Sequence, residues 1–177
     1  TFRRVLFRSV GDLQGNARLA KEAWGQAKAA GSDLVAFPEM FITGYNAQDL
    51  VMKPAFQRAA IAEIEGLAQA CKEGPALAIG GPWVEAGALF NAYFILNDGR
   101  IVSVVEKHHL PNQSVFDEVR IFSSGEIDGP YSVGNTRIGS PLCEDAWHPD
   151  LAETLQELCA AFLLVPNGSP YPPQTSE

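Results

Sequence analysis

The chain has few basic residues, few cysteines and few histidines, and the shortage of positive charge excludes one class of function at once. Among its 177 residues, 13 are lysine or arginine and 21 are aspartate or glutamate, so the formal net charge is −8. A protein that binds nucleic acid neutralises phosphates with clustered positive charge, and no basic stripe in this sequence offers that charge. We therefore expect no nucleic-acid partner.

The three cysteines, Cys71, Cys143 and Cys159, have the spacing of neither a metal site nor a disulfide framework. A small, odd number of thiols is typical of a reducing compartment, so the sequence predicts a cytoplasmic location. Cys143 and His148 are near enough in the chain to bind one metal ion together, but no third or fourth ligand follows at a suitable spacing. We expect no bound metal.

Long apolar runs and nucleotide-binding loops are also missing. No apolar run approaches the roughly 18 residues of a membrane-spanning helix, so we expect no membrane partner. The glycines at 79–81 do not open a helix, and the sequence has no G-x-x-x-x-G-K-[ST] loop. These residues therefore indicate no nucleotide site.

What the sequence does contain is the alternating pattern of a layered α/β domain. Apolar residues make up 46% of the chain and charged residues 19%, which is ordinary for one globular domain. Apolar spacing and Gly or Pro boundaries predict helices over 16–30, 54–72 and 149–160. Short apolar runs predict strands over 33–37, 76–81, 89–96, 101–107, 131–134, 136–142 and 161–168. The segment NDGR (97–100) predicts a tight hairpin turn within this layered arrangement.

Three chemically active residues come after predicted strands. Glu39 follows DLVAFP, Lys107 follows IVSVVE and Cys143 follows TRIGSPL. Loops after strands are the usual place for sites in layered α/β folds, although each residue alone also has an ordinary structural explanation. Together they form a chemical set, because a weakly nucleophilic thiol needs a base or a positive neighbour. Glu39 can act as the base, Lys107 can favour the thiolate and then the oxyanion, and the backbone amide of Glu144 is a candidate second oxyanion donor.

The histidines and the other thiols leave alternatives open. His148 lies five residues after the candidate nucleophile and is the alternative base in a Cys–His pair. His108 and His109 are adjacent, so on a strand their side chains would face opposite ways. Cys71 and Cys159 fall on apolar helical faces, where a small buried thiol is the expected interpretation.

The three segments that contain the candidate residues resemble the carbon–nitrogen hydrolases of the nitrilase superfamily. FPEMFITGY contains Glu39, EKHHLPN contains Lys107 and LCEDAW contains Cys143, in the order found in that superfamily. The resemblance extends over about residues 9–171. Further segments, VGDLQGN, GYNAQDL, LPNQSVFDEVRIFSSG and CEDAWHP, are most similar to the glutaminase (amidase) domains of glutamine-dependent NAD synthetases.

This resemblance implies a nitrilase-like four-layer α-β-β-α sandwich that is incomplete at the C-terminus of the chain. We interpret residues 1–8 as a doubtful or non-native start and residues 9–177 as a partial carbon–nitrogen hydrolase domain. A sandwich without its closing strands leaves a sheet edge unpaired, so we expect the chain alone to be poorly soluble or inactive. The resemblance also implies a homo-oligomer when the protein is full length.

The resemblance further implies roles for individual residues. Glu39 is the expected general base, Lys107 the transition-state stabiliser and Cys143 the nucleophile. Five residues are expected to contact the substrate, namely Ser169, Tyr45, Phe116, Glu144 and Gln113. Two positions depart from the pattern of these amidases, since Gln113 stands where a substrate-contacting tyrosine is usual and Thr175 stands where a lysine is usual.

The implied reaction is hydrolysis of the glutamine side-chain amide through a thioester on Cys143. The ammonia would serve a synthetase domain of the same polypeptide, which lies outside this chain and converts deamido-NAD to NAD with ATP and Mg²⁺. No cofactor is expected in the present domain. Two alternatives remain open: a stand-alone amidase that acts on another small amide, and an inactive fragment or assembly module that keeps only the fold.

Overall fold

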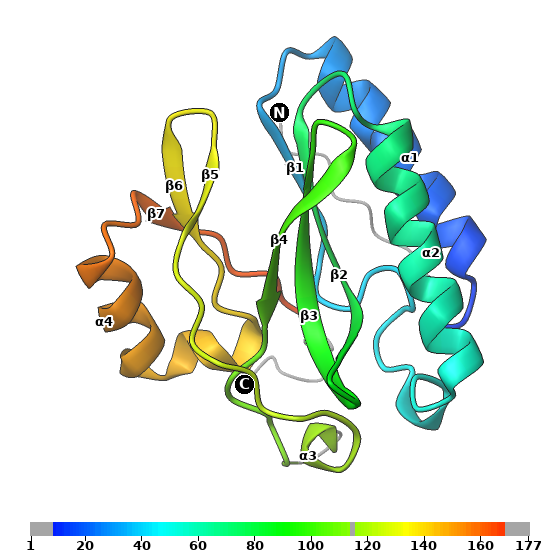
Figure 1. Cartoon of the computed structure of the whole chain (residues 1–177), viewed down its shortest axis with the longest axis vertical. Coiled ribbons are helices and arrows are strands. Elements are labelled where there is room, and N and C mark those ends of the chain that lie inside the picture. Colours follow the sequence, from blue (N-terminus) through cyan, green and yellow to red (C-terminus); the bar gives the residue numbers. More distant parts are fainter. Residues whose placement is uncertain (1–8, 114–115, 169–177) are drawn as a thin grey trace, which may run out of the picture.

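In the described residues, two α-helices, one short 3-10 helix and four strands form the first half of the fold. The computed structural model describes residues 9–113 and 116–168 (Figure 1). The elements of this half are α1 (Leu13–Ala29), β1 (Leu34–Ala36), the short 3-10 helix η1 (Gln48–Leu50), α2 (Pro54–Ala70), β2 (Ala76–Glu85), β3 (Ala88–Asn97) and β4 (Arg100–Glu106). No helix in the described part of the chain is both long and apolar enough to cross a membrane.

The boundaries of α1 and α2 follow from local sequence signals. The Asp12 carboxylate accepts a hydrogen bond from the Gly15 N–H (2.9 Å) and so caps the first turn of α1. Gly31, which has φ +70°, follows the last turn in the left-handed conformation that glycine adopts without strain. Pro54 opens α2, where a missing N–H has no consequence. The predicted helices therefore match the observed ones within a few residues at each end.

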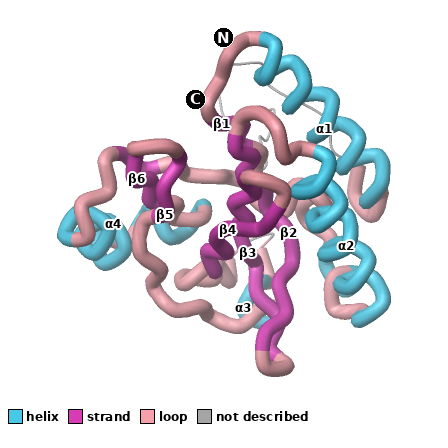
Figure 2. The backbone as a smooth tube through the Cα atoms, turned by 45° about the horizontal axis from the view of Figure 1, so that its top comes forward, coloured by secondary structure: helices cyan, strands magenta, loops and turns pink. Residues whose placement is uncertain are grey.

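The second half contains shorter elements and longer loops. They are α3 (Glu118–Ile121), β5 (Tyr131–Val133), β6 (Thr136–Gly139), the 3-10 helix η2 (Cys143–Trp147), α4 (Pro149–Glu157) and β7 (Phe162–Leu163). Figure 2 shows loop backbone directly after β4 and between α3 and β5. The chain therefore has regular scaffolding around β1–β4 and irregular backbone where the candidate site residues lie.

The strands of the described residues form two separate sheets. In the first sheet the order is β1-β2-β3-β4, with β1 parallel to β2 and the remaining pairs antiparallel. The β3–β4 hairpin turns at Asp98 and Gly99, which have φ +50° and +80°, as a two-residue turn of the Asp-Gly type requires. In the second sheet the order is β5-β6-β7, with β5 antiparallel and β7 parallel to β6. The hairpin predicted at NDGR is thus confirmed.

Alternation of side chains along β2 and β3 separates two cores and creates four layers. Leu77 and Phe94 belong to the core beneath α1 and α2, whereas Ala78 and Tyr93 belong to the core between the two sheets. On the outer side of the second sheet, a Cβ at Gly139 would come within 2.7 Å of Leu155 in α4. The described residues therefore run helix, sheet, sheet, helix across the molecule, which is the expected layer order (Figure 1).

Two expectations near the end of the chain are wrong. The strand predicted over 161–168 is reduced to the two residues of β7, because the following backbone serves the candidate site: the Pro166 carbonyl accepts from the Cys143 N–H (3.0 Å). Cys159 does not lie on a buried helical face, since α4 ends at Glu157 and Cys159 is exposed with φ +59°. Cys71, by contrast, is buried as expected.

The contact between β2 and the loop after β1 generates a stability prediction. A Cβ at Gly80 would lie 2.2 Å from the Met40 backbone nitrogen, so Gly80→Ala must displace the segment that contains Glu39. We expect a loss of about 1–3 kcal/mol in the free energy of unfolding, measured with urea on the intact protein. The matched control is Gly66→Ala on α2, where nothing lies within 4 Å of the new methyl group. Gly66→Ala should raise the free energy of unfolding by about 0.5–1 kcal/mol. Equal effects of the two substitutions would contradict the tight contact between Gly80 and the Met40 backbone.

Candidate active site

Glu39 lies in the loop that follows β1, and backbone hydrogen bonds to β2 hold this loop in place. The Phe37 N–H donates to the Ala78 carbonyl (2.8 Å), and the Ile42 N–H donates to the Gly80 carbonyl (3.0 Å). The Glu39 side chain between these anchors is fully buried. A buried carboxylate at a strand end requires charged or polar partners, which the neighbouring strands supply.

Lys107 comes directly after β4 and supplies the first of these partners. Its N–H donates to the Asn91 carbonyl (2.8 Å), and its own carbonyl accepts from the Gly125 N–H (2.9 Å). The fully buried ammonium lies between two carboxylates: Nζ is 2.6 Å from Glu39 Oε1 and 2.9 Å from Glu118 Oε2. The structure therefore brings together two of the three predicted catalytic residues and adds a second carboxylate.

Glu118 and Asn91 are parts of this cluster that sequence reasoning missed. Glu118 opens the short helix α3 and also accepts a hydrogen bond from the Tyr45 hydroxyl (2.8 Å). Asn91 Nδ2 donates to Glu39 Oε1 (2.9 Å) and lies 3.4 Å from both Glu118 oxygens. A signal for Asn91 was present, because a lone amide inside the apolar run LFNAYFIL must find a polar partner when buried. Nothing comparable distinguishes Glu118 among the acidic residues of its loop.

Burial and mutual charge set the protonation of the cluster. Burial alone would lower the pKa of Lys107, but the charges of Glu39 and Glu118 outweigh it and raise that pKa. Burial raises the pKa of Glu118, and the charge of Glu39 adds to this although Lys107 opposes both. Burial, followed by the charge of Glu118, raises the pKa of Tyr45. Lys107 is therefore held as a cation and Tyr45 as a neutral hydrogen-bond donor.

Cys143 occupies a sharp turn at the start of η2. Its φ is +49°, which is unusual for a residue with a side chain and typical of strained backbone at functional positions. The thiol is almost fully buried, and its Sγ lies 3.3 Å from Asn167 Oδ1. Asn167 precedes Gly168, whose Cβ would lie 3.0 Å from the Tyr45 ring. The candidate nucleophile is thus connected to the Tyr45 side of the charged cluster.

The segment after β7 connects the candidate nucleophile with the candidate base. Asn167 contacts the Cys143 thiol, and the next residue, Gly168, donates its N–H to Glu39 Oε2 (3.1 Å). A side chain at Gly168 would crowd this position, because a Cβ would lie 3.0 Å from both Glu39 Oε2 and the Tyr45 ring. Glu39 therefore has one oxygen turned to Lys107 and Asn91 and the other turned to the segment that contacts the thiol.

Asp145 joins the Cys143 turn to the loop that carries Lys107. This fully buried carboxylate accepts from the Leu142 N–H (3.0 Å) and from the His109 N–H (2.6 Å). Burial raises the pKa of Asp145, and its two backbone hydrogen bonds oppose this. Because Leu142 precedes Cys143 and His109 follows Lys107 by two residues, one carboxylate fixes both segments. The sequence marked CEDAW as a motif but gave Asp145 no role.

The predicted substrate-contacting residues are only partly brought together. Tyr45 and Phe116 lie beside each other, with ring centroids 6.1 Å apart. Gln113 is exposed, and its carbonyl accepts from the Phe116 N–H (3.0 Å). The Glu144 carboxylate lies 3.7 Å from His148 Nε2. Ser169, like Thr175, lies outside the described residues.

The histidines adopt positions that the sequence did not predict. Because β4 ends at Glu106, His108 and His109 lie past the strand, and their rings meet edge to face at 4.7 Å rather than on opposite sides of a sheet. His148, the alternative base, stacks on the His109 ring with centroids 3.8 Å apart. His148 therefore lies against His109 and Glu144, whereas residues 167–168 connect the thiol with Glu39.

The chain matches the Carbon-nitrogen hydrolase family over residues 7–177. It belongs to that family. It is 52% identical over 163 residues to the glutamine-dependent NAD(+) synthetase of Rhodobacter capsulatus, and 34% identical over 165 residues to that of Thermotoga maritima. Each alignment covers 92% of this chain but only 30% and 29% of the relative, so the chain spans less than a third of their length.

Solved structures share the fold of this chain. The glutamine-dependent NAD+ synthetase of Acinetobacter baumannii matches with a TM-score of 0.87 and 30% identity, over 93% of this chain and 31% of that one. A cysteine-to-alanine mutant of the nitrilase-superfamily amidase from Nesterenkonia AN1 matches with a TM-score of 0.80 and 23% identity, over 96% of this chain and 64% of that one. The fold is therefore the nitrilase-like α/β fold expected from the sequence.

Removal of Lys107 tests the charged cluster. Lys107→Met leaves the carboxylates of Glu39 and Glu118 buried without a cation, which should lower the free energy of unfolding by about 3–5 kcal/mol near pH 7.5. Burial already raises the pKa of Glu118, and loss of the opposing Lys107 charge leaves that pKa further above its unfolded value. The variant should therefore regain stability as the pH falls toward about 5 and lose it as the pH rises.

The control for this change is Arg18→Ala, which removes an exposed ion pair with Glu22 (3.9 Å). Its effect on urea unfolding should stay within about 0.5 kcal/mol and should not vary with pH in this window. If Lys107→Met changed the free energy of unfolding no more than this control, and with no pH dependence, Lys107 would not hold two buried carboxylates together.

Proposed function

We propose that this chain is the glutaminase domain of a glutamine-dependent NAD synthetase and that it hydrolyses the side-chain amide of glutamine. The observation that carries the proposal is a buried Glu39–Lys107–Glu118 cluster linked through residues 167–168 to a cysteine on a strained turn. Identity of 52% to a glutamine-dependent NAD(+) synthetase over 92% of the chain supports glutamine as the amide.

In the first half of the proposed reaction, Cys143 attacks the carbon of the glutamine side-chain amide. Glu39 takes the thiol proton, and its Oε2 suits this role because Oε1 is engaged by Lys107 and Asn91. A C–S bond forms, and the amide oxygen becomes an oxyanion that the Lys107 ammonium stabilises with the Glu144 N–H. The C–N bond then breaks, and ammonia leaves with the proton that Glu39 returns.

In the second half, water hydrolyses the thioester. Glu39 removes a proton from the water, the resulting hydroxide adds to the thioester carbon, and the C–S bond breaks to release glutamate. The proton returns to the Cys143 sulfur. Glu118 does not take part in these transfers, since its oxygens accept hydrogen bonds from Tyr45 and Lys107. Its contribution is to keep Lys107 in place and positively charged.

The aromatic pair and its neighbours form the proposed substrate contacts. Tyr45 and Phe116 lie at the Glu118 end of the cluster, and Gly168 packs against the Tyr45 ring. Ser169 follows Gly168 directly, which supports its assignment as a substrate contact. Gln113, whose carbonyl accepts from the Phe116 N–H, and Glu144, which follows Cys143 directly, complete the proposed set.

The remaining parts of the proposal concern the whole protein. A synthetase domain in the same polypeptide would use ATP and Mg²⁺ and consume the ammonia, and the intact enzyme would be a cytoplasmic homo-oligomer. Three free thiols in the described residues are compatible with a reducing compartment. The share of each relative that this chain covers leaves room for a further domain.

Replacement of the nucleophile tests the reaction. In the intact protein, Cys143→Ala should abolish release of glutamate from glutamine, a loss of at least about 10⁴-fold, because no thioester can form. NAD formation with added ammonia should continue, because the synthetase reaction does not need this thiol. Glutamate release by a coupled assay and NAD formation by chromatography are the two measurements.

Cys159→Ala is the matched control, since this exposed thiol lies outside the site and should leave both rates unchanged. Glutamate release that persists in Cys143→Ala would refute the catalytic thiol. If the wild-type protein released ammonia from other small amides but not from glutamine, the stand-alone amidase would replace the glutaminase.

A second substitution tests the proposed substrate contact. Phe116→Ala should raise KM for glutamine by roughly tenfold with a smaller change in kcat, because it removes apolar contact area made equally in the ground and transition states. Val119→Ala, at an exposed position of α3, should leave KM unchanged. Equal KM values for the two variants would show that Phe116 does not contact glutamine.

A further inference from the structure

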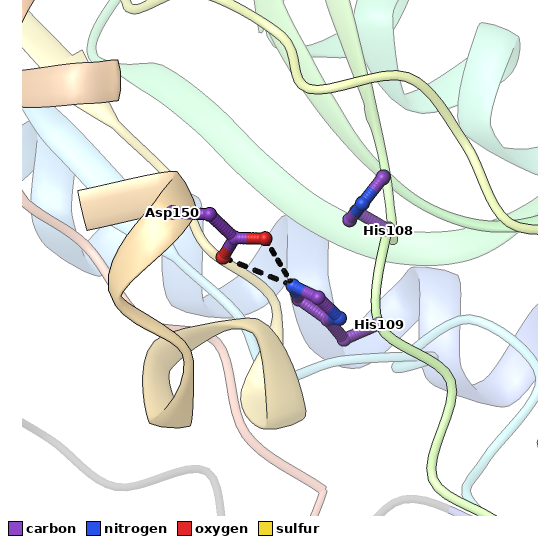
Figure 3. A group of neighbouring side chains, drawn as sticks. All are labelled: His108, His109 and Asp150. Carbon is purple, nitrogen blue, oxygen red and sulfur yellow. Dashed lines mark hydrogen bonds and ion pairs between the residues drawn. The ribbon is translucent and has the colours of Figure 1, made fainter. Parts of the chain in front are cut away.

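Outside the charged cluster, the structure gathers a second group of side chains with metal-binding chemistry. His108 and His109 follow β4, and Asp150 lies in the first turn of α4. Figure 3 shows the Asp150 carboxylate directed toward the His109 ring, with His108 beside it. One ligand atom from each of the three residues lies within 4.8 Å of the other two. The contact between His109 and Asp150 joins parts of the chain that are 41 residues apart.

We propose that His108, His109 and Asp150 form a binding site for one divalent transition-metal ion such as Zn²⁺. Two imidazoles and one carboxylate are a donor set that such ions bind readily, with further positions left for water. This site does not depend on the glutaminase function.

The separation of the donors fits an ion of this size. His109 Nε2 is 2.8 and 3.0 Å from the two Asp150 oxygens. A tetrahedral ion with bonds of about 2.0 Å separates its ligand atoms by about 3.3 Å. Because the three donor atoms lie within 4.8 Å of one another, a small outward movement of Asp150 and an approach of His108 by at most about 1.5 Å bring them to one ion. In the metal-free chain a proton on His109 Nε2 occupies the place between the ring and the carboxylate.

The surroundings of the histidines also match those of metal ligands. His108 Nδ1 lies 2.7 Å from the Gly125 carbonyl, to which it donates, so Nε2 retains the lone pair that binds metal. His109 is fixed on two sides, because its N–H donates to Asp145 and its ring stacks on His148. All three ligand residues are partly exposed, which gives an ion access from solvent.

The test is metal binding to the intact, untagged protein in a Cys143→Ala, Cys159→Ser background, which removes two thiols that would compete for the ion. Titration calorimetry with Zn²⁺ should give one site per chain, and Co²⁺ should show the visible absorption of a bound ion. His109→Ala, His108→Ala and Asp150→Asn should each weaken Zn²⁺ binding at least about tenfold.

Glu153→Gln is the matched control, because it neutralises another, exposed carboxylate of α4 that is no proposed ligand, and Zn²⁺ affinity should stay within about threefold of the parent. Asp150→Asn keeps the shape of the side chain, so it remains informative if a histidine variant fails to fold, as thermal unfolding would reveal. Absence of stoichiometric Zn²⁺ binding, or unchanged affinity in His108→Ala and Asp150→Asn, would overturn the proposal.

Discussion

The ammonium of Lys107, buried between the carboxylates of Glu39 and Glu118, is the interaction on which the rest of the site depends. Two carboxylates shielded from water repel each other strongly, and a buried charge without a partner is among the costliest features a fold can contain. Lys107 makes their proximity tolerable, and Asn91, Tyr45 and the Gly168 backbone supply the remaining donors. Among the described residues, Asn91 Oδ1 is the buried side-chain atom left without a hydrogen-bond partner.

Around this cluster, the fold fixes chain segments rather than single side chains. The first sheet presents Glu39 and Lys107 from the ends of β1 and β4, while Cys143 comes from the second sheet, after β6. Asp145 fixes these two segments relative to each other, since one of its oxygens accepts from the His109 N–H and the other from the Leu142 N–H. The geometry between nucleophile and cation is therefore a property of how the two sheets pack, with one buried carboxylate as the connection.

The sequence predicted those parts of the site that sit at the ends of periodic elements. Glu39, Lys107 and Cys143 could be proposed because each follows an apolar run and the three together form a chemical set. The α/β class follows from the same apolar patterning, whereas the four-layer order was implied by the family resemblance. Glu118 could not be found in this way, because α3 has only four residues and its loop carries several acidic side chains. The length of β7 was overestimated for a related reason. The apolar character of this segment does not show that the Pro166 carbonyl bonds to the Cys143 N–H instead of to a neighbouring strand.

The hydrogen bond from Gly168 to Glu39 spans 129 positions of the chain, and this separation bears on how the site forms during folding. Closing so long a loop carries an entropic cost that local hairpins such as β3–β4 avoid, so contacts of this kind are expected to form late. The helices and both sheets can exist before Gly168 reaches the loop after β1. A measurement of helix and strand content therefore does not show that this site has formed. Glu39 and the Cys143 thiol take their final positions only when Gly168 has made its hydrogen bond to Glu39.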